Sequence, residues 1–210
     1  MSKSEYSQSE ERSQTISLFT SIWGFGLSNT NKLFKMGMRS VTDLQNNMHL
    51  LSVNQKIGLK YFDDSQKRIP YDETTEIYNV INKYLHEVMP EDIIESIVCG
   101  SYRRQQPDSG IIDILITRKD DGKVEGILES LLEKLKNIGL IRETLTFSKN
   151  FKCKNQFNGI CKLKESLPFR RLDIKVINTK TYKHKYLNKL GLQKRKLSFC
   201  FTFLYWFCLF

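Results

Sequence analysis

The stretch of this sequence with the clearest chemical potential runs from Gly100 to Thr117 and reads GSYRRQQPDSGIIDILIT. A Gly-Ser turn offers backbone N–H groups and a hydroxyl to an anion, and the arginines that follow supply charge. A polar loop ends at Gly110, and the next apolar run carries one carboxylate, Asp113, which is costly to bury unless it is paired or binds a metal. These residue types indicate a metal-assisted nucleotide site. The alternative is a β-hairpin whose polar face happens to hold Asp113.

A second carboxylate, Asp173, lies in the stretch 170–177, which reads RRLDIKVI. Its apolar residues, Leu172, Ile174 and Val176, alternate with charged ones, and this period of two predicts a strand with one buried face. Asp173 falls on the charged face. A solvent-facing strand of mixed charge would show the same pattern, so the residue types alone leave the role of Asp173 open.

Near the amino terminus, a Gly-x-Gly turn at Gly24 and Gly26 follows an apolar run. The stretch 29–36 reads as a short helix that stops at Gly37. A helix, a glycine turn and a second helix form a helix-hairpin-helix, in which the glycines let backbone N–H groups approach a DNA phosphate. A tight turn without any ligand is the alternative.

The remaining pattern predicts which elements must position these residues. We expect a helix over 40–51, a boundary at Pro70, and a helix capped by Asp72 or Thr74 that runs to Met89. The core stripe of that helix is Ile77, Val80, Ile81, Tyr84, Leu85 and Val88. Further expected elements are strands at 97–99 and 112–117, a helix over 124–138, and strands at 140–147, 151–163 and 170–177. Together they predict a small mixed sheet that follows an all-helical front unit.

The overall charge and composition exclude few classes of function. The net charge of the 210-residue chain is +10, but seven lysines and arginines and no acidic residue follow position 177, so the preceding residues account for only three of these charges. The five cysteines show no metal or disulfide spacing, which favours a reducing, intracellular compartment. We expect residues 1–15 to be a disordered arm. The apolar run 199–210 is too short to span a bilayer unaided.

Taken together, four segments resemble those of the family X DNA polymerases, the group of DNA polymerases beta, lambda and mu and terminal deoxynucleotidyltransferase. In the family's order they are LFTSIWGFG (18–26), QKIGLKY (55–61) through RIP (68–70), GSYRR (100–104) through GIID (110–113), and RRLD (170–173). The resemblance covers about residues 16–177. It implies an α+β fold with a helix-hairpin-helix DNA-binding domain at 16–70 and a nucleotidyltransferase palm with a mixed sheet at 71–177. Residues 178–210 resemble nothing in the family and are expected to be an unrelated basic and aromatic tail, which would leave the palm incomplete at its C-terminus.

The resemblance also implies roles for particular residues. Backbone carbonyls at Thr20, Ile22 and Phe25 match positions that hold a monovalent cation against the primer phosphate, beside Gly24 and Gly26. Four residues match the grip on the incoming nucleotide's phosphates: Gly100, Ser101, Arg104 and Gly110. Asp113 and Asp173 match two of the three carboxylates that hold a pair of Mg²⁺ (or Mn²⁺) ions, and one carboxylate on each of two strands is what a shared metal needs.

One departure bears on this chemistry. Where the family reads Gly-Asp-x-Asp, this chain has Ile111 in place of the first aspartate. Asp108 is wrongly spaced to take its place on the same strand face as Asp113. The loss of a metal ligand is expected to weaken the metal pair and to lower the rate by three decades or more, which is at or beyond the two to three decades (about 3–4 kcal/mol) that one site group contributes.

From these residues we expect a nuclear, monomeric family X polymerase that acts in base-excision or end-joining repair without contacting a membrane. Its substrates would be gapped or primer-template DNA and deoxynucleoside triphosphates. A catalytically inactive DNA-binding remnant of such a polymerase is the alternative. A nucleotidyltransferase acting on RNA ends shares the Gly-Ser and carboxylate pattern, but the helix-hairpin-helix argues against it.

Overall fold

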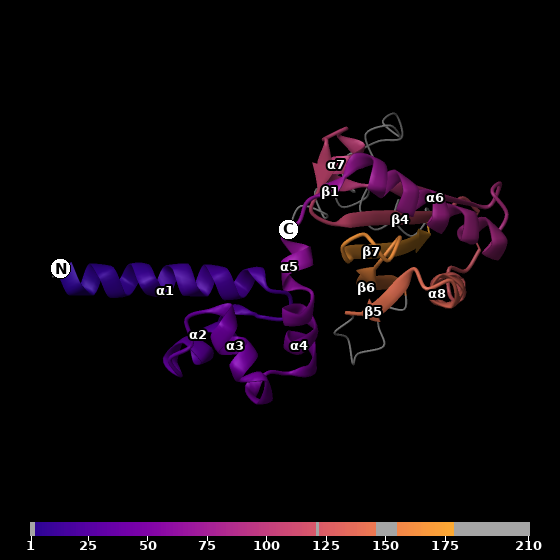
Figure 1. Cartoon of the computed structure of the whole chain (residues 1–210). Coiled ribbons are helices and arrows are strands. Elements are labelled where there is room, and N and C mark those ends of the chain that lie inside the picture. Colours follow the sequence, from indigo (N-terminus) through magenta and orange to yellow (C-terminus); the bar gives the residue numbers. More distant parts are fainter. Residues whose placement is uncertain (1–2, 121, 146–154, 179–210) are drawn as a thin grey trace, which may run out of the picture. The chain divides into compact units, whose positions relative to one another are not determined.

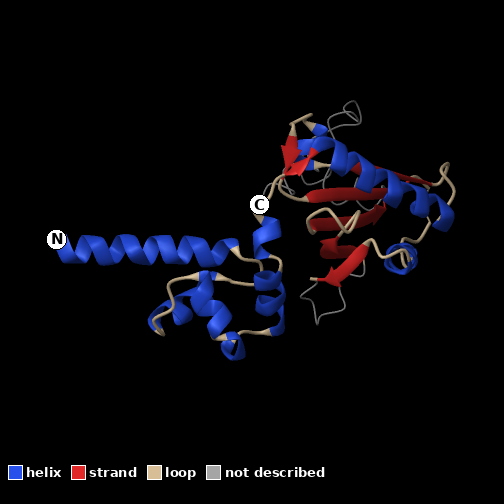
Figure 2. Ribbon diagram, viewed as in Figure 1, coloured by secondary structure: helices blue, strands red, loops and turns tan. Residues whose placement is uncertain are grey.

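A computed structural model describes residues 3–120, 122–145 and 155–178 of the chain. They form two compact units that divide between Asp64 and Ser65, the first helical and the second built on a β-sheet (Figures 1 and 2). The α+β expectation is therefore confirmed. The division precedes the expected boundary at Pro70, because Ile69 and Pro70 form a strand within the second unit. The expectations for residues 179–210 lie outside the described residues.

The first unit consists of helices around one small apolar core. They are α1 (Lys3–Ser21), α2 (Leu27–Lys35), α3 (Val41–Asn46), the 3₁₀ helix η1 (Met48–Leu50), α4 (Val53–Lys60) and α5 (Phe62–Ser65), whose last residue crosses the division. The core residues are Phe19, Ile22, Phe25, Leu33, Met38, Leu44, Leu51 and Leu59. Ser40 and Ser52 begin α3 and α4 with capping boxes, in which the side chains of Asp43 and Gln55 accept from the cap backbone.

Helix α1 is longer than the sequence indicated, since it begins at Lys3 where we expected a disordered arm up to residue 15. Its polar residues find partners elsewhere in the unit. Arg12 donates to the Asn31 side chain over 3.0 Å, Arg39 lies 3.2 Å from the Glu11 carboxylate, and Thr15 is buried. These contacts come from residues far along the chain, so local composition could not reveal them.

The second unit is a five-stranded sheet in the order β2-β4-β7-β6-β5 (Figure 1). Its strands are β2 (Ile94–Val98), β4 (Ile112–Arg118), β5 (Ile141–Thr144), β6 (Gln156–Cys161) and β7 (Arg170–Asn178). Strands β4 and β7 run parallel, and the other neighbours are antiparallel. The expected mixed sheet is thus present, and the antiparallel β2–β4 pair brings the Gly-Ser turn back toward the Asp113 strand.

Two helices cover one face of this sheet, α6 (Tyr71–Val88) and α8 (Ile127–Asn137). Their apolar residues share one core with alternate residues of β4 and β7: Ile77, Ile81, Leu85, Leu131 and Leu135 pack with Ile112, Ile114, Ile116, Leu172, Ile174 and Val176. The expected stripe of α6 is therefore core. The helix starts at Tyr71, so Asp72 and Thr74 lie inside its first turn and are not its caps. Because strand residues alternate between faces, Asp113 and Asp173 project from the opposite face.

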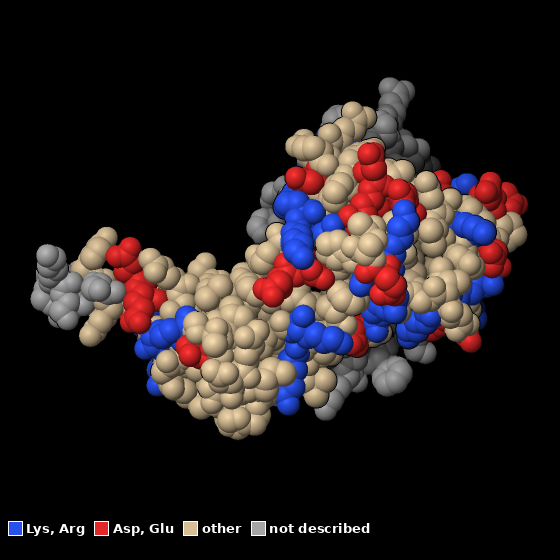
Figure 3. Space-filling view, viewed as in Figure 1, with Lys and Arg blue, Asp and Glu red and all other residues tan. Residues whose placement is uncertain are grey.

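Small elements complete the second unit near the carboxylates. Helix α7 (Gly100–Arg103) follows β2, and a two-residue strand β3 (Asp108–Ser109) pairs with β1 (Ile69–Pro70). The sequence suggested a turn and a loop here, and did not suggest the β1–β3 pairing. No helix in the described part of the chain is long and apolar enough to cross a membrane. The face in Figure 3 carries Lys and Arg interspersed with Asp and Glu.

Candidate active site

The two carboxylates singled out in the sequence are opposite each other in the sheet. In the parallel β4–β7 register, Asp113 pairs with Asp173. Neighbouring strands lie about 4.8 Å apart, so the two side chains are adjacent to each other on the face of the sheet that α6 and α8 do not cover. Asp173 Oδ1 is buried and has no hydrogen-bond partner among the described residues. A buried carboxylate oxygen of this kind is well suited to a cation.

Burial dominates the electrostatics of this pair. It raises the pKa of Asp113 above its ordinary value, and the nearby Arg171 guanidinium acts in the opposite direction. Burial also raises the pKa of Asp173 to about 6, against the opposing effect of Arg171 and with a further contribution from the Asp113 charge. The pair is therefore costly to ionise fully without a bound cation.

The Gly-Ser turn approaches Asp113 closely. Gly100 has a positive φ of +65°, and a Cβ there would lie 3.3 Å from Asp113 Oδ2. The Cys99 N–H also donates to the Asp113 carbonyl over 2.8 Å. Position 100 therefore favours glycine for two reasons, the positive φ and the short distance to the Asp113 carboxylate. The close approach brings the turn next to the carboxylate pair.

The rest of the expected phosphate-binding set lies around the same turn. Ser101 Oγ donates to Ser109 Oγ over 2.8 Å, which draws the loop that contains Gly110 toward the turn. Arg104 is the C-cap residue that follows α7, and it is exposed. Gly100, Ser101, Gly110, Asp113 and Asp173 are thus brought together by β2, β4 and β7, with Arg104 at an exposed margin.

Arg68 is a cationic residue of this site whose role the sequence reasoning missed. Its Nε and Nη2 lie 2.9 and 2.7 Å from Asp108 Oδ1, and its Nη1 would lie 3.1 Å from a Cβ at Gly110. The β1–β3 pairing, with Ile69 opposite Ser109, holds Arg68 beside the loop. Because that pairing joins residues 40 positions apart, no local pattern indicated it.

Aromatic packing between α7 and α6 also holds the Gly-Ser turn in place. The rings of Tyr71 and Tyr102 stack with centroids 4.2 Å apart, and the hydroxyls of Tyr102 and Thr75 lie 3.0 Å apart. Both contacts attach α7 to the first turns of α6. The sequence reasoning assigned no role to these side chains.

The candidate DNA-binding residues lie in the first unit, between α1 and α2. Thr20 is in the last turn of α1, and Ile22 and Phe25 lie in the turn that follows, where the Phe25 N–H donates to the Ile22 carbonyl over 3.2 Å. The two glycines differ: Gly24 has φ +91° and a Cβ there would lie 3.1 Å from the Asn54 backbone, whereas a Cβ at Gly26 meets nothing within 4 Å. Gly24 is therefore needed for packing within the unit, and only Gly26 lies at an open surface.

Comparisons with known proteins agree with this geometry. Residues 68–179 match the family of the DNA polymerase beta palm, and residues 17–66 match the fingers domain of DNA polymerase lambda. A fold of this kind, with paired carboxylates beside a Gly-Ser turn, defines a nucleotidyltransferase palm. The chain belongs to the family X DNA polymerases.

Individual relatives point the same way. The chain is 36% identical over 182 residues to DNA polymerase lambda of Arabidopsis thaliana, covering 84% of this chain and 34% of that protein. It is 31% identical over 163 residues to DNA polymerase lambda of Rattus norvegicus, covering 77% and 28%. It is 33% identical over 133 residues to DNA nucleotidylexotransferase of Xenopus laevis, covering 63% and 26%. The chain thus spans about a third or less of the length of these relatives.

Proposed function

We propose that this chain forms the fingers and palm part of a DNA polymerase that adds deoxynucleotides to a primer 3′-hydroxyl during nuclear DNA repair. The observation that carries the proposal is the Asp113–Asp173 pair, which lies directly beside the Gly100–Ser101 turn in a family X palm. In this proposal the turn, Arg104 and Gly110 bind the triphosphate, and the carboxylates hold a divalent metal ion.

The side chains at the carboxylate pair determine how well the divalent ions implied by the family resemblance would fit there. Two hard carboxylate oxygen donors on rigid strands, one of them buried without a partner, suit Mg²⁺ or Mn²⁺. Such an ion would activate the primer hydroxyl and stabilise charge on the transferring phosphoryl group. Within the described residues, no group of three or more His, Cys, Asp or Glu is placed to hold a metal ion. The side chains therefore fit one ion better than a pair.

In the first unit, we propose that the turn at Gly26 meets a DNA phosphate through its backbone N–H groups. The carbonyls of Thr20, Ile22 and Phe25 would hold a monovalent cation there. The lysines and arginines of this unit would add a salt-sensitive, sequence-independent attraction to DNA. We further propose that the chain acts as a monomer and without contact to a membrane.

The test is a single-nucleotide incorporation assay on gapped DNA with Mg²⁺ or Mn²⁺, run beside a DNA-binding titration at several salt concentrations. We expect slow incorporation that disappears in Asp113→Asn and Asp173→Asn, since each removes a metal ligand. Asp120→Asn, an exposed carboxylate at the far end of β4, is the matched control and should keep the wild-type rate. Incorporation that persists in Asp173→Asn would overturn the assignment.

A second candidate function, DNA binding without catalysis, is favoured by one observation. Ile111 directly precedes β4, two residues before Asp113, at the position where the family resemblance implies a carboxylate. Salt-sensitive DNA binding with no incorporation by the wild-type chain would support this candidate over the first. Failure to bind DNA at low salt would contradict both.

A further inference from the structure

A buried guanidinium lies between the carboxylate strand β7 and the loop that contains Gly110. Arg170 begins β7, three residues before Asp173, and only 5% of it is exposed. Its Nε and Nη2 donate to the carboxylate of Glu73 on α6 over 2.8 and 2.7 Å. This bidentate pairing uses one edge of the guanidinium and leaves Nη1 for other acceptors.

The Nη1 atom of Arg170 binds the backbone that precedes β1. It donates to the carbonyl of Lys67 over 3.0 Å and to that of Arg68 over 3.2 Å. Both residues lie in irregular chain between α5 and β1, and β1 itself is only two residues long. Because so short a strand pair contributes little stability, the bonds from Arg170 are a substantial part of what fixes this backbone.

The Arg68 side chain extends from that backbone to the loop that contains Gly110. Its Nη1 would lie 3.1 Å from a Cβ at Gly110, and its Nε and Nη2 engage Asp108 Oδ1. The side chain is 58% exposed, so packing restrains it little. An arginine binds a phosphate well only when its planar guanidinium is held in the right orientation. The position of the Arg68 backbone therefore matters for this contact.

We infer that Arg170 is a positioning residue for nucleotide binding, which holds the Lys67–Arg68 backbone so that the Arg68 guanidinium can bind the triphosphate beside Gly110. This inference rests on the proposed function, because the ligand is the same nucleotide. Glu73 keeps the charge of Arg170 paired, so that the guanidinium can be buried. The Arg170–Glu73 pair is neutral, so its effect on an anionic ligand comes from geometry and not from net charge.

The experiment is equilibrium dialysis of the full chain against a labelled Mg²⁺–dATP complex. The decisive variant combines Arg170→Met with Glu73→Leu, because it removes the bonds to the two carbonyls, leaves no buried charge and keeps the net charge unchanged. We expect it to bind the nucleotide about three- to tenfold more weakly than the wild type. Glu73→Gln is the matched control. It keeps Arg170 and its carbonyl contacts, so it should be less stable but should bind the nucleotide almost as tightly as the wild type.

Two further readouts distinguish positioning from a general loss of structure. Arg68→Met should weaken nucleotide binding by about tenfold or more, and adding the Arg170 and Glu73 changes to it should cause no further loss, because the contact that they position is already gone. The Arg170 and Glu73 double variant should also bind Mn²⁺ without nucleotide as tightly as the wild type, since the Asp113–Asp173 pair is unchanged.

Wild-type nucleotide affinity in the double variant would overturn the inference. So would equal weakening by Glu73→Gln, or losses that add fully in the triple variant. If the double variant fails to fold, Arg170→Lys gives the same comparison, because it keeps the charge opposite Glu73 but has a single nitrogen and loses the carbonyl contacts. A wild-type chain that binds no nucleotide would overturn the proposed function as well, whereas nucleotide binding that does not depend on Arg170 would overturn this inference alone.

Discussion

At the scale of single residues, the site holds two carboxylates where water solvates their charges poorly. Asp173 is held beside Asp113 with one oxygen buried and unpartnered among the described residues, and Arg171 compensates only part of the cost. Buried charge of this kind lowers the stability of the metal-free protein, and a ligand that binds only the folded state restores it. Function and stability are therefore in conflict at this pair.

Replacing Asp173 by asparagine should stabilise the metal-free chain at neutral pH. Burial raises the pKa of Asp173 from 3.8 to about 6, so the folded state binds this proton more tightly than the unfolded state. The stabilisation from the protonated carboxyl is complete below about pH 4 and is lost as the pH rises through 6. At pH 7.5 in EDTA, Asp173→Asn should gain about 1–3 kcal/mol in the free energy of unfolding, and at pH 4 almost nothing.

Chemical denaturation at the two pH values measures this difference. The control is the same pair of proteins with saturating Mn²⁺, which should stabilise the wild type and have little effect on Asp173→Asn. A variant that is equally stabilised at pH 4 and 7.5 would show that the carboxylate charge is not the cause.

Asp108 should oppose triphosphate binding. Its carboxylate engages Arg68 beside Gly110, so it occupies a guanidinium that is otherwise available to a phosphate, and it adds negative charge to the loop. Asp108→Asn should therefore tighten the binding of a Mg²⁺–dATP complex about three- to tenfold at low salt, and less at 0.5 M salt because exposed charges are screened. Equilibrium dialysis with labelled nucleotide measures both values.

The matched control for this variant is Asp120→Asn, which removes an exposed carboxylate from an ion pair with Arg118 at the opposite end of β4. It changes the net charge by the same amount but lies away from the Gly-Ser turn. Equal tightening in both variants would assign the effect to net charge and contradict a role for Asp108 at the turn.

At the scale of elements, the sequence predicted the helices and strands whose apolar residues recur with a clear period. The helical stripe of α6 and the alternation of β7 gave those elements within a few residues. The two carboxylates that the sequence singled out lie opposite each other on β4 and β7. The sequence did not predict the β1–β3 pairing, the place of Arg68, or the early start of α1. Each of these features depends on contacts with residues far away in the chain. The stabilisation that such contacts provide cannot be predicted from a local sequence pattern.

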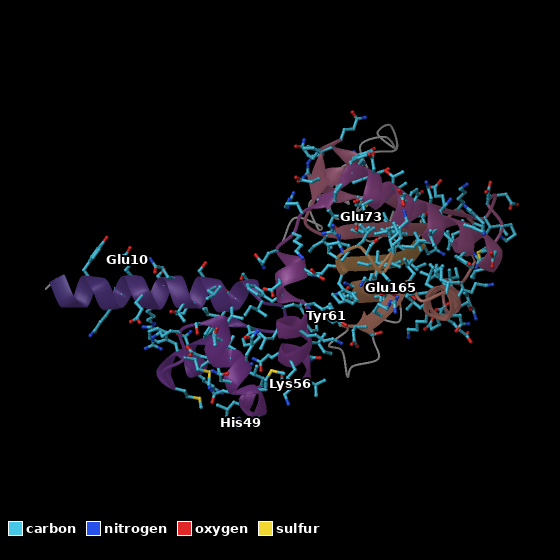
Figure 4. The ribbon with its side chains drawn as sticks, viewed as in Figure 1. Glu10, His49, Lys56, Tyr61, Glu73 and Glu165 are labelled. Carbon is cyan, nitrogen blue, oxygen red and sulfur yellow. The ribbon has the colours of Figure 1, made fainter. Side chains whose placement is uncertain are left out.

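A buried ion pair fixes the start of β7, three residues before Asp173. Arg170 Nε and Nη2 lie 2.8 and 2.7 Å from the carboxylate of Glu73 on α6, and both side chains are buried. Figure 4 labels Glu73 where α6 meets the sheet. Arg170 Nη1 also donates to the carbonyls of Lys67 and Arg68 over 3.0 and 3.2 Å. One guanidinium thus connects β7, α6 and the segment that carries the Arg68 side chain.

Removing only one partner of this ion pair should strongly lower the stability of the protein. Arg170→Met leaves Glu73 as a buried, unpaired charge and should cost about 3–5 kcal/mol in the free energy of unfolding. The double variant Arg170→Met with Glu73→Leu should recover much of that loss, because no charge is left buried. Denaturant titrations of the wild type, both single variants and the double variant measure the coupling. A double variant as unstable as the sum of the singles would contradict the ion-pair explanation.

At the scale of the whole molecule, the chain carries two separate apolar cores. Leu44 is fully buried in the core of the helical unit, and Ile81 is fully buried between α6 and the sheet. Each core is built from residues on its own side of the division between Asp64 and Ser65. The proposed roles divide in the same way, with DNA attraction in the first unit and metal and triphosphate binding in the second.

Leu44→Ala and Ile81→Ala should therefore uncouple the two functions. Each removes a fully buried side chain and should destabilise its own unit by about 2–5 kcal/mol, while hydrogen exchange in the other unit stays at the wild-type rate. On warming, Leu44→Ala should lose DNA binding at a lower temperature but keep Mn²⁺ binding, and Ile81→Ala should do the opposite. If either variant lost both activities at one common temperature and raised exchange throughout the chain, the two units would unfold as one. The proposed division of labour would then have no thermodynamic basis.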